Sequence, residues 1–299
     1  MNKKLCVLAA PASKDLAKSV AKILHAELID VELKTFPDGE SKVRINGELD
    51  GKFAVIVQST YPPVDTHLMQ MLFIVNKAKK MGADVCAVTP YLAYARQDKE
   101  FLKGEAVSME ILASIFGSSG AKNLVTVDVH SQMALSYFKI AAYNVSAVPL
   151  LADYFKSKKL FQPLAVSPDS GGLARAKEFG KIIGTSSIAL PKFRDRTTGE
   201  VKIDPKAREL KTAIGRDVIL IDDIISTGGS IVKASEVLLK AGCKNVFVAC
   251  THALLLDKAL EKIMDAGVKE VVGTNTVPSK VSKVDVAPAI CDRVSKLYE

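Results

Sequence analysis

The amino-acid sequence predicts an α/β protein with two domains, each built on a mostly parallel β-sheet flanked by helices. Short runs rich in β-branched residues alternate with amphipathic segments along almost the whole chain. These runs are apolar at successive positions, which is typical of strands that are buried on both faces of a parallel sheet. The length of 299 residues is about that of two ordinary domains.

The apolar runs give the expected strands, and the amphipathic segments between them give the expected helices. The strands are Leu5–Ala10, Phe53–Gln58, Val85–Thr89, Leu124–Asp128, Leu164–Ser167, Val218–Asp222, Val246–Thr251 and Glu270–Thr274. The helices include Asp15–Leu24, Thr66–Met81, Met109–Phe116 and Ser230–Ala241. The two domains are expected to cover residues 1–146 and 147–299. The final helix, at about Ala287–Tyr298, could pack on either domain.

Composition and charge narrow the class of protein. Hydrophobic residues make up 48% and charged residues 25%, an ordinary balance for a soluble protein. No apolar run approaches the roughly 20 residues needed to span a bilayer. Lys3 and Lys4 precede an apolar stretch that is shorter than most signal-peptide cores, so we expect a cytoplasmic protein. The net charge of +8 comes from lysines scattered along helix faces, and we expect neither a nucleic-acid nor a membrane partner.

The five cysteines show no CxxC or Cys/His metal spacing, and most lie within apolar runs. A thiol in such a position behaves as a small hydrophobic group. We therefore expect neither structural zinc nor a disulfide framework.

The strongest chemical signal is a buried strand that leads into two carboxylates, Asp222 and Asp223, and then into a loop of small residues. Ligands of open α/β sheets bind beyond the carboxyl ends of strands. The loop can wrap backbone N–H groups around a phosphate, and the helix that follows adds a partial positive charge. Paired aspartates suit the vicinal hydroxyls of a ribose. The predicted ribose 5-phosphate site comprises Asp222, Asp223, Ser226, Thr227, Gly228, Gly229 and Ser230. The alternative is a plain strand-to-helix turn with an Asp or Ser cap.

This segment resembles the phosphoribosyl-diphosphate-binding motif of the type I phosphoribosyltransferase fold. The rest of the chain resembles the ribose-phosphate pyrophosphokinases, a family within that fold. The segments that carry this resemblance occur in family order at Phe36–Glu40, Pro90–Asp98, Val127–Ser131 and Ser167–Gly172. The resemblance implies two phosphoribosyltransferase-like domains. It also implies an enzyme that transfers the β,γ-diphosphoryl group of Mg-ATP to the anomeric hydroxyl of ribose 5-phosphate for nucleotide biosynthesis.

The resemblance assigns the ATP site to two segments of the first half. The loop at Phe36–Glu40 is expected to reach into a neighbouring subunit, which implies a homo-oligomer with a dimer as its smallest working unit. The residues implied in ATP binding are Phe36, Asp38, Glu40, Arg96, Gln97 and Asp98. Taken alone, the first segment reads as a Pro/Gly turn. Arg96 could instead form a surface ion pair with Asp98 or Glu100.

The resemblance also implies a Mg²⁺ cofactor, with His130 and Asp169 as the metal-linked residues. Mg²⁺ prefers oxygen ligands, and a lone histidine after a strand is more often structural. Asp169 lies in a Pro-Asp-Ser-Gly sequence that also suits a β-turn. Lys192 and Arg194 match a Lys-x-Arg pair that acts on the transferring group from a mobile loop, and are the implied catalytic residues. As a charge run, this segment would otherwise be a solvated loop.

Two features depart from the family pattern. Ser226 stands where many members carry an acidic residue, which puts a carboxylate general base at this position in doubt. The segment Lys99–Glu105 is less basic than in the allosterically regulated enzymes.

Two rival functions remain, a phosphoribosyltransferase that consumes the product and a non-catalytic regulator of the same fold. Neither needs both the ATP segments and the Lys192/Arg194 pair.

Overall fold

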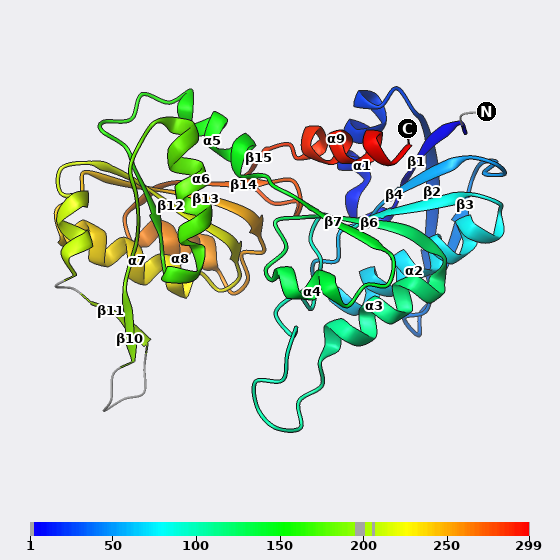
Figure 1. Ribbon diagram of the computed structural model, residues 1–299, viewed down its shortest axis with the longest axis horizontal. Helices are drawn as coiled ribbons and strands as arrows, with labels where there is room; N and C mark the ends of the chain where they lie inside the picture. The colour runs from blue at the N-terminus through cyan, green and yellow to red at the C-terminus, as the bar shows by residue number, and fades with distance from the viewer. Residues whose placement is uncertain (1–2, 195–200, 205–206, 299) are drawn as a thin grey trace. The chain divides into compact units, whose positions relative to one another are not determined.

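The computed structural model describes the backbone of residues 3–194, 201–204 and 207–298 (Figure 1). The side chains at positions 192–194, 201 and 202 lie outside this description. The chain forms two compact units. The first comprises the residues up to Ser146 together with those from Asp285 onward, and the second comprises Ala147–Val284.

The sheet of the first unit is parallel except at one edge. Among the described residues its strand order is β3-β2-β1-β4-β5-β6-β7, and only β3 runs antiparallel to its neighbour. The strands are β1 (Leu5–Ala9), β2 (Glu27–Thr35), β3 (Ser41–Ile45), β4 (Phe53–Val57), β5 (Asp84–Val88), β6 (Ala121–Val127) and β7 (Ala141–Val145). The strands expected near residues 5, 53, 85 and 124 are all present in this sheet.

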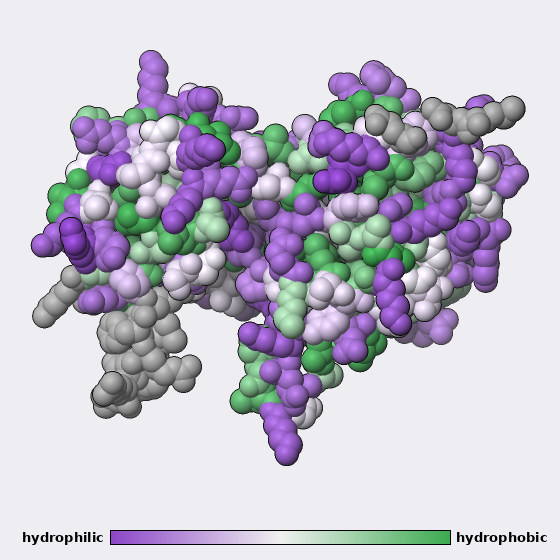
Figure 2. All heavy atoms as spheres, viewed as in Figure 1, coloured by the Kyte–Doolittle hydropathy of each residue, from purple (hydrophilic) through white to green (hydrophobic). Residues whose placement is uncertain are grey.

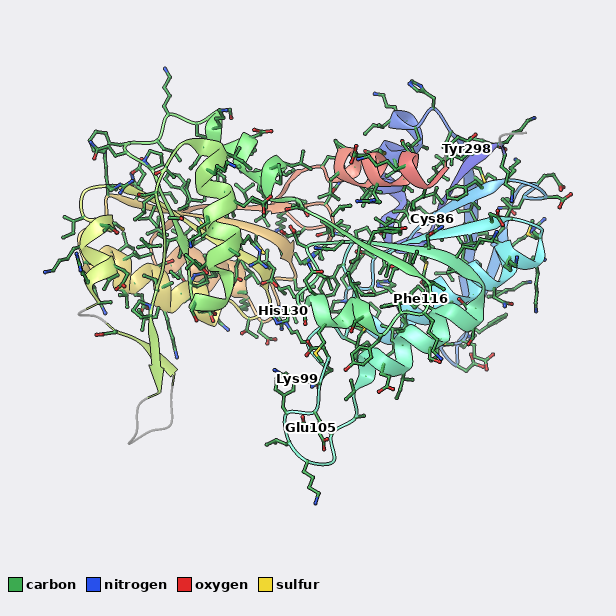
Figure 3. The ribbon with its side chains drawn as sticks, viewed as in Figure 1. Cys86, Lys99, Glu105, Phe116, His130 and Tyr298 are labelled. Atoms are coloured by element: carbon green, nitrogen blue, oxygen red, sulfur yellow. The ribbon has the colours of Figure 1, made fainter. Side chains whose placement is uncertain are left out.

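Helices cover this sheet because the central strands are apolar on both faces. The helices are α1 (Lys14–Ile23), α2 (Val64–Lys80), α3 (Ser108–Ser119), α4 (Gln132–Ser136) and α9 (Ala287–Tyr298). Leu8 and Ile56 belong to a core cluster with Met71 of α2 and Phe116 of α3, all fully buried. The labelled Cys86 and Phe116 both lie inside this unit (Figure 3). The central strands are therefore buried between layers of helices.

The final helix, α9, packs on the first unit. It contacts α1, and the Cys291 thiol donates a hydrogen bond to the backbone oxygen of Val20 at 3.7 Å. The Tyr298 hydroxyl donates to the backbone oxygen of Lys3, and the Tyr298 ring lies 5.8 Å from that of Phe53. The helix also contacts β6 and β7, and its last turn, with Tyr298, lies beside the start of the chain (Figure 3).

The sheet of the second unit is parallel throughout, with the order β15-β14-β13-β12-β8-β9 among the described residues. The strands are β8 (Leu164–Ser167), β9 (Ser187–Ala189), β12 (Asp217–Ile225), β13 (Asn245–Ala253), β14 (Val268–Thr274) and β15 (Ser282–Val284). A separate antiparallel pair is formed by β10 (Lys192–Arg194) and β11 (Val201–Ile203).

Helices flank both faces of this second sheet. They are α5 (Val148–Lys156), α6 (Leu173–Ile183), α7 (Gly229–Lys240) and α8 (Ala259–Asp265). Val218 and Leu220 of β12 belong to the core cluster with α7 and α8. Ile219 and Ile221, which point to the other face, belong to the cluster with α5 and α6. The alternation along β12 therefore matches a strand that is buried on both sides.

All five cysteines are free and buried. Burial raises the pKa of the Cys86 thiol to about 12, so this thiol stays protonated at neutral pH. No described helix is long and apolar enough to cross a membrane. Hydrophilic and apolar residues intermix on the visible face of the molecule (Figure 2).

Candidate functional site

The strand order of the second unit creates a switch point between β8 and β12. The chain continues outward from β8 to β9, whereas from β12 it continues in the other direction to β13 and β14. Parallel strands end at the same edge of a sheet, and loops that diverge from neighbouring strands leave a crevice there. The loop that follows β12 is the one predicted to bind the 5-phosphate, and the loop that follows β8 carries Asp169, a predicted metal-linked residue. The fold brings these two loops together at the switch point.

Asp222 and Asp223 lie within β12, so the prediction that the strand ends at Asp222 is wrong. The strand continues to Ile225, where its residues pair with the end of β13. The Asp222 carboxylate accepts the N–H of Asp223 at 3.0 Å, and the Asp223 carboxylate accepts the N–H of Ile224 at 3.0 Å. Asp223 is only 6% exposed. These bonds hold both carboxylates at the end of the strand.

Two carboxylates side by side in a poorly hydrated site disfavour one another's ionisation. Burial, followed by the negative charge of Asp223, raises the pKa of Asp222 to about 7. The positive charge of Arg175 acts in the opposite direction. At neutral pH, Asp222 is therefore close to the point at which it changes between hydrogen-bond donor and acceptor.

The small-residue loop after β12 has the backbone of a phosphate cradle. Gly228 has φ of +78°, a conformation that side chains other than glycine rarely adopt. A Cβ at this position would also lie 3.1 Å from the side chain of Ile263. Thr227 and Ser230 are exposed beside the start of α7, where the first N–H groups of the helix have no partner within it. An anion is the ligand that suits such a loop.

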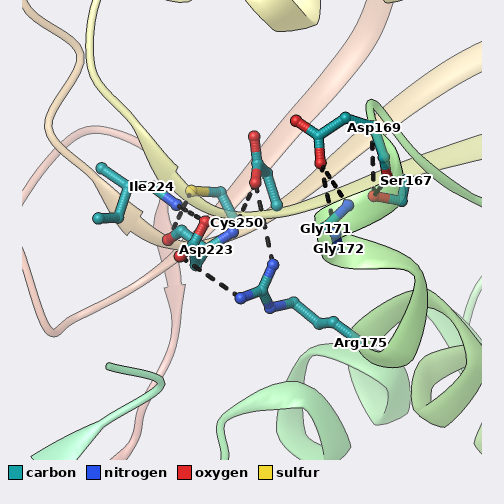
Figure 4. A network of polar contacts seen from close by, with 9 residues as sticks. Ser167, Asp169, Gly171, Gly172, Arg175, Asp223, Ile224 and Cys250 are labelled. Atoms are coloured by element: carbon teal, nitrogen blue, oxygen red, sulfur yellow. Dashed lines mark hydrogen bonds and ion pairs between the residues drawn. The ribbon is translucent and has the colours of Figure 1, made fainter. Parts of the chain in front are cut away.

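The loop after β8 brings a third carboxylate to the crevice (Figure 4). One oxygen of the half-buried Asp169 side chain accepts the N–H groups of Gly171 at 3.1 Å and Gly172 at 3.3 Å. The Ser167 hydroxyl donates to the backbone oxygen of Asp169 at 2.7 Å. A Cβ at Gly172 would lie 2.4 Å from the Ser167 oxygen, so the close approach requires glycine here. Residues Ser170–Gly172 form a short 3₁₀ helix in place of the β-turn that the sequence also suited, and Asp169 is the N-cap that these bonds hold in a fixed position.

Sequence analysis missed Arg175, which binds both members of the aspartate pair (Figure 4). Its guanidinium lies 3.4 Å from a carboxylate oxygen of Asp223 and 3.9 Å from one of Asp222. Arg175 is in the first turn of α6, where the helix dipole disfavours a positive charge. A cation in such a position indicates a specific acidic partner, and that partner becomes apparent only when the fold places β8 beside β12.

In the first unit, the loop after β5 is fastened to the loop after β4. The Ser59 hydroxyl oxygen accepts the N–H of Tyr91 at 2.9 Å, and that of Thr60 accepts the N–H of Ala93 at 2.8 Å. Beyond this anchor, Arg96 and Gln97 are exposed. The alternative role of Arg96 was a surface ion pair with Asp98 or Glu100. Asp98 is only 8% exposed, so it is not a surface residue. The loop therefore presents Arg96 and Gln97 outward from a rigid base.

His130 follows β6 at the same edge of the first sheet and is exposed (Figure 3). The turn before it is tightly held. Asp128 has φ of +38° and its N–H donates to the backbone oxygen of Val145 at 2.9 Å. The N–H of Val129 donates to the side chain of Asn144 at 2.8 Å. These bonds to β7 aim His130 away from the core.

Phe36, Asp38 and Glu40 lie in the exposed turn that joins β2 to β3. The N–H of Phe36 donates to the backbone oxygen of Glu40 at 2.8 Å, and the Asp38 carboxylate accepts the N–H of Glu40 at 3.1 Å. The turn lies at the same edge as the loop after β5, but β1 and β4 separate β2 from β5 in the sheet. This turn and Arg96 are therefore not on neighbouring strands.

Lys192 and Arg194 have their backbone in β10, opposite Ile203 and Val201 of β11. The prediction of a loop that begins at Lys192 is thus wrong at its start, because an antiparallel ladder holds these residues in a strand. The side chains of Lys192 and Arg194 lie outside the described part of the chain, as do all of residues 195–200.

The chain matches known proteins over nearly its whole length. Residues 5–120 match the family model described as the N-terminal domain of ribose phosphate pyrophosphokinase, and residues 191–297 match the phosphoribosyl synthetase-associated domain. The ribose-phosphate pyrophosphokinase of Sulfurisphaera tokodaii is 38% identical over 97% of this chain and 100% of the relative. That of Methanothermobacter thermautotrophicus is 39% identical over 96% of this chain and 98% of the relative. The crystal structure of phosphoribosylpyrophosphate synthetase from Mycobacterium smegmatis superposes with a TM-score of 0.87 at 28% identity, covering 99% of both chains.

Two mostly parallel sheets, with paired carboxylates and an anion-binding loop at the switch point of the second, define an α/β protein of the phosphoribosyltransferase type. Within this class, the family models and the relatives that match nearly the whole chain identify one family. The chain belongs to the ribose-phosphate pyrophosphokinase family.

Proposed function

We propose that the protein transfers the β,γ-diphosphoryl group of ATP to the anomeric hydroxyl of ribose 5-phosphate, giving phosphoribosyl pyrophosphate and AMP. The observation that carries this proposal is the arrangement of side chains and loops at the switch point between β8 and β12. There the aspartate pair suits the ribose hydroxyls, and the loop at Ser226–Ser230 suits the 5-phosphate. The near full-length match to ribose-phosphate pyrophosphokinases supports the same reaction.

In the proposed reaction each of the two units would bind one of the two substrates. The second unit would hold ribose 5-phosphate, while Arg96, Gln97 and His130 of the first unit would bind the phosphates of ATP, and Phe36 its base. Arginine is suited to this task because its planar guanidinium offers several donors in a fork that matches phosphate oxygens. Positioning and charge stabilisation would then supply most of the rate, as in other phosphoryl transfers.

Mg²⁺ is the proposed cofactor, and the donor chemistry fits it. Among the described residues no three His, Cys, Asp or Glu side chains gather into a preformed metal cage. Mg²⁺ is commonly held by one or two carboxylates together with the phosphates of the substrate, and so it needs no such cage. Asp169 of the second unit is the proposed carboxylate, and the exposed His130 of the first unit is the other metal-linked residue that the family resemblance implies. When bound, the ion would neutralise charge on the ATP phosphates.

The reaction is tested by its products. Purified protein incubated with ATP, Mg²⁺ and ribose 5-phosphate should yield AMP and phosphoribosyl pyrophosphate in equal amounts, because both come from one transfer. Chromatographic separation of the nucleotides measures this directly, with chelated Mg²⁺ as the control. ADP as the main nucleotide product would instead indicate transfer of one phosphoryl group and would contradict the proposal.

A homo-oligomer is the proposed assembly, and an apolar strip on the first unit supports it. Met69 and Phe73 of α2 are 45% and 41% exposed, and Ile111 and Ile115 of α3 are 58% and 43% exposed. We name these four residues the α2/α3 strip. Exposed apolar residues that lie together on neighbouring helices commonly mark a protein interface.

The charges around the α2/α3 strip suit a second copy of the chain. Met69 and Phe73 line a cavity of about 510 Å³ with Glu40 and Asp65, and also line one of about 470 Å³ with Lys77 and Lys80. The acidic end and the basic end lie at opposite ends of α2. In a two-fold interface both copies use the same surface, and the two α2 helices can run antiparallel across it. The acidic end of each α2 would then face the basic end of its partner.

Replacing Phe73 with glutamate should therefore break the oligomer and abolish most activity, because the Phe36–Glu40 turn could no longer reach a partner's site. Sedimentation measures the assembly, and product formation measures the activity. Ile23→Glu is the matched control, since Ile23 is 44% exposed on α1.

A mixing experiment tests the shared site itself. Phe36→Ala subunits mixed with Asp223→Ala subunits should regain activity, because some hybrid sites would carry neither defect. A wild-type protein that is fully active as a demonstrated monomer would refute the shared site.

A further inference from the structure

The second unit contains an arginine that spans both carboxylates of the ribose pair without belonging to any of the recognised segments. Arg175 lies in the first turn of α6, three residues beyond Gly172. Its side chain is 19% exposed, and its two terminal nitrogens reach different partners, Asp222 at 3.9 Å and Asp223 at 3.4 Å. One side chain from the β8 side of the crevice therefore ties down two carboxylates on β12 (Figure 4).

Arg175 packs against the loop that carries Asp169. A Cβ at Gly172 would lie 3.5 Å from a terminal nitrogen of Arg175, which is an ordinary contact distance, so the backbone of the Asp169 loop lies beside the guanidinium. Asp223 is further held by the hydrogen bond that the Cys250 thiol donates to its backbone oxygen at 3.4 Å. The guanidinium and its two partners thus form one packed unit that links neighbouring loops.

The positive charge of Arg175 favours the ionised form of the two neighbouring carboxylates. Burial and the charge of Asp223 raise the pKa of Asp222, and Arg175 opposes that rise. A protonated carboxyl carries a donor in place of one of its acceptors. Ribose hydroxyls that meet two ionised, fixed carboxylates find acceptors at both, which neutral or mobile carboxyls would not provide.

We propose that Arg175 is a positioning residue for ribose 5-phosphate, which bridges Asp222 and Asp223 so that both carboxylates accept hydrogen bonds from the ribose hydroxyls. This inference rests on the proposed function of the crevice. The role requires the fork of a guanidinium, because its separate nitrogens reach two acceptors at once, whereas the single ammonium of lysine concentrates its charge at one point.

The test compares Arg175→Gln, Arg175→Lys and the control Lys177→Gln, which removes an exposed lysine two residues further along the same helix. Arg175→Gln should raise KM for ribose 5-phosphate by about 10- to 100-fold and leave KM for ATP near the wild-type value, as expected for the loss of charged hydrogen bonds. Arg175→Lys should fall between Arg175→Gln and the wild type. Lys177→Gln should match the wild type. Calorimetric titration of ribose 5-phosphate, in the presence of a non-reacting ATP analogue, gives the same comparison without turnover.

Each outcome decides the inference. A selective rise in KM for ribose 5-phosphate with partial rescue by lysine supports it. Equal rises in KM for both substrates, together with a lowered melting temperature, would show a purely structural role and overturn it. If Arg175→Gln does not fold, Arg175→Lys carries the test, and a wild-type KM for ribose 5-phosphate in that variant overturns the inference. A wild-type protein that makes no phosphoribosyl pyrophosphate would refute the proposed function instead, and this result is distinct from all the others.

Discussion

Replacing Lys192 or Arg194 with alanine should lower kcat by about 10²- to 10⁵-fold, the range found when a cationic contact to a transferring phosphoryl group is removed. The reason is that charge moves onto the bridging oxygen and the leaving group during transfer. If the two cations meet that charge chiefly in the transition state, kcat and kcat/KM should fall together while KM changes little. Steady-state kinetics measures all three quantities. The double variant should lose less than the product of the two single losses, because residues that act as a unit are not additive.

Two further variants separate catalysis from binding in that experiment. Lys211→Ala removes an exposed lysine from the 3₁₀ helix Arg208–Ala213 and should behave as the wild type. Thr227→Val should mainly raise KM for ribose 5-phosphate, because its hydroxyl is proposed to contact the 5-phosphate before and during transfer alike. Near-normal kcat in Lys192→Ala, with a greatly raised KM for ATP, would mean that Lys192 binds substrate rather than catalyses.

The central strands could be predicted from the sequence because burial on both faces leaves a continuous apolar run. Phe53–Val57 is one example, in which every residue is buried. No strand was expected between residues 11 and 52, yet β2 and β3 lie there. They form the edge of the sheet, and β2 alternates charged and apolar residues over much of its length. Such a pattern lacks the apolar continuity on which the other assignments relied.

The candidate site was predictable where one segment carries the chemistry, as at Asp222 and Asp223. It was not predictable where the chemistry arises between segments. Arg175 reaches the aspartate pair only because β8 and β12 are neighbours in the sheet, and no spacing along the chain indicates that pairing. The acidic and basic ends of the α2/α3 strip are likewise a property of the folded surface. Local pattern therefore indicates what a loop can bind, and topology indicates which groups act together.

Replacing Asp223 with asparagine should weaken ribose 5-phosphate binding by about 10- to 150-fold, the equivalent of losing one hydrogen bond to a charged group. The substitution keeps the shape of the side chain, and its amide oxygen can still accept the N–H of Ile224 as the carboxylate does at 3.0 Å. KM for ribose 5-phosphate should rise while KM for ATP stays near the wild-type value. Asp265→Asn, an exposed change at the end of α8, is the matched control.

The pH dependence of ribose 5-phosphate binding should also differ between Asp223→Asn and the wild type, and it can be measured independently of KM. In the wild type, Asp222 has a pKa of about 7, so ribose 5-phosphate should bind more tightly as pH rises through 7 and Asp222 becomes an acceptor. The negative charge of Asp223 is one cause of that raised pKa. Asp223→Asn removes this charge, so the pKa of Asp222 should fall and the midpoint of the binding curve should move to lower pH. The sugar phosphate has its own ionisation near pH 6, but it is common to both proteins and cancels in the comparison. A midpoint that is unchanged in Asp223→Asn would show that the two carboxylates do not act as a coupled pair.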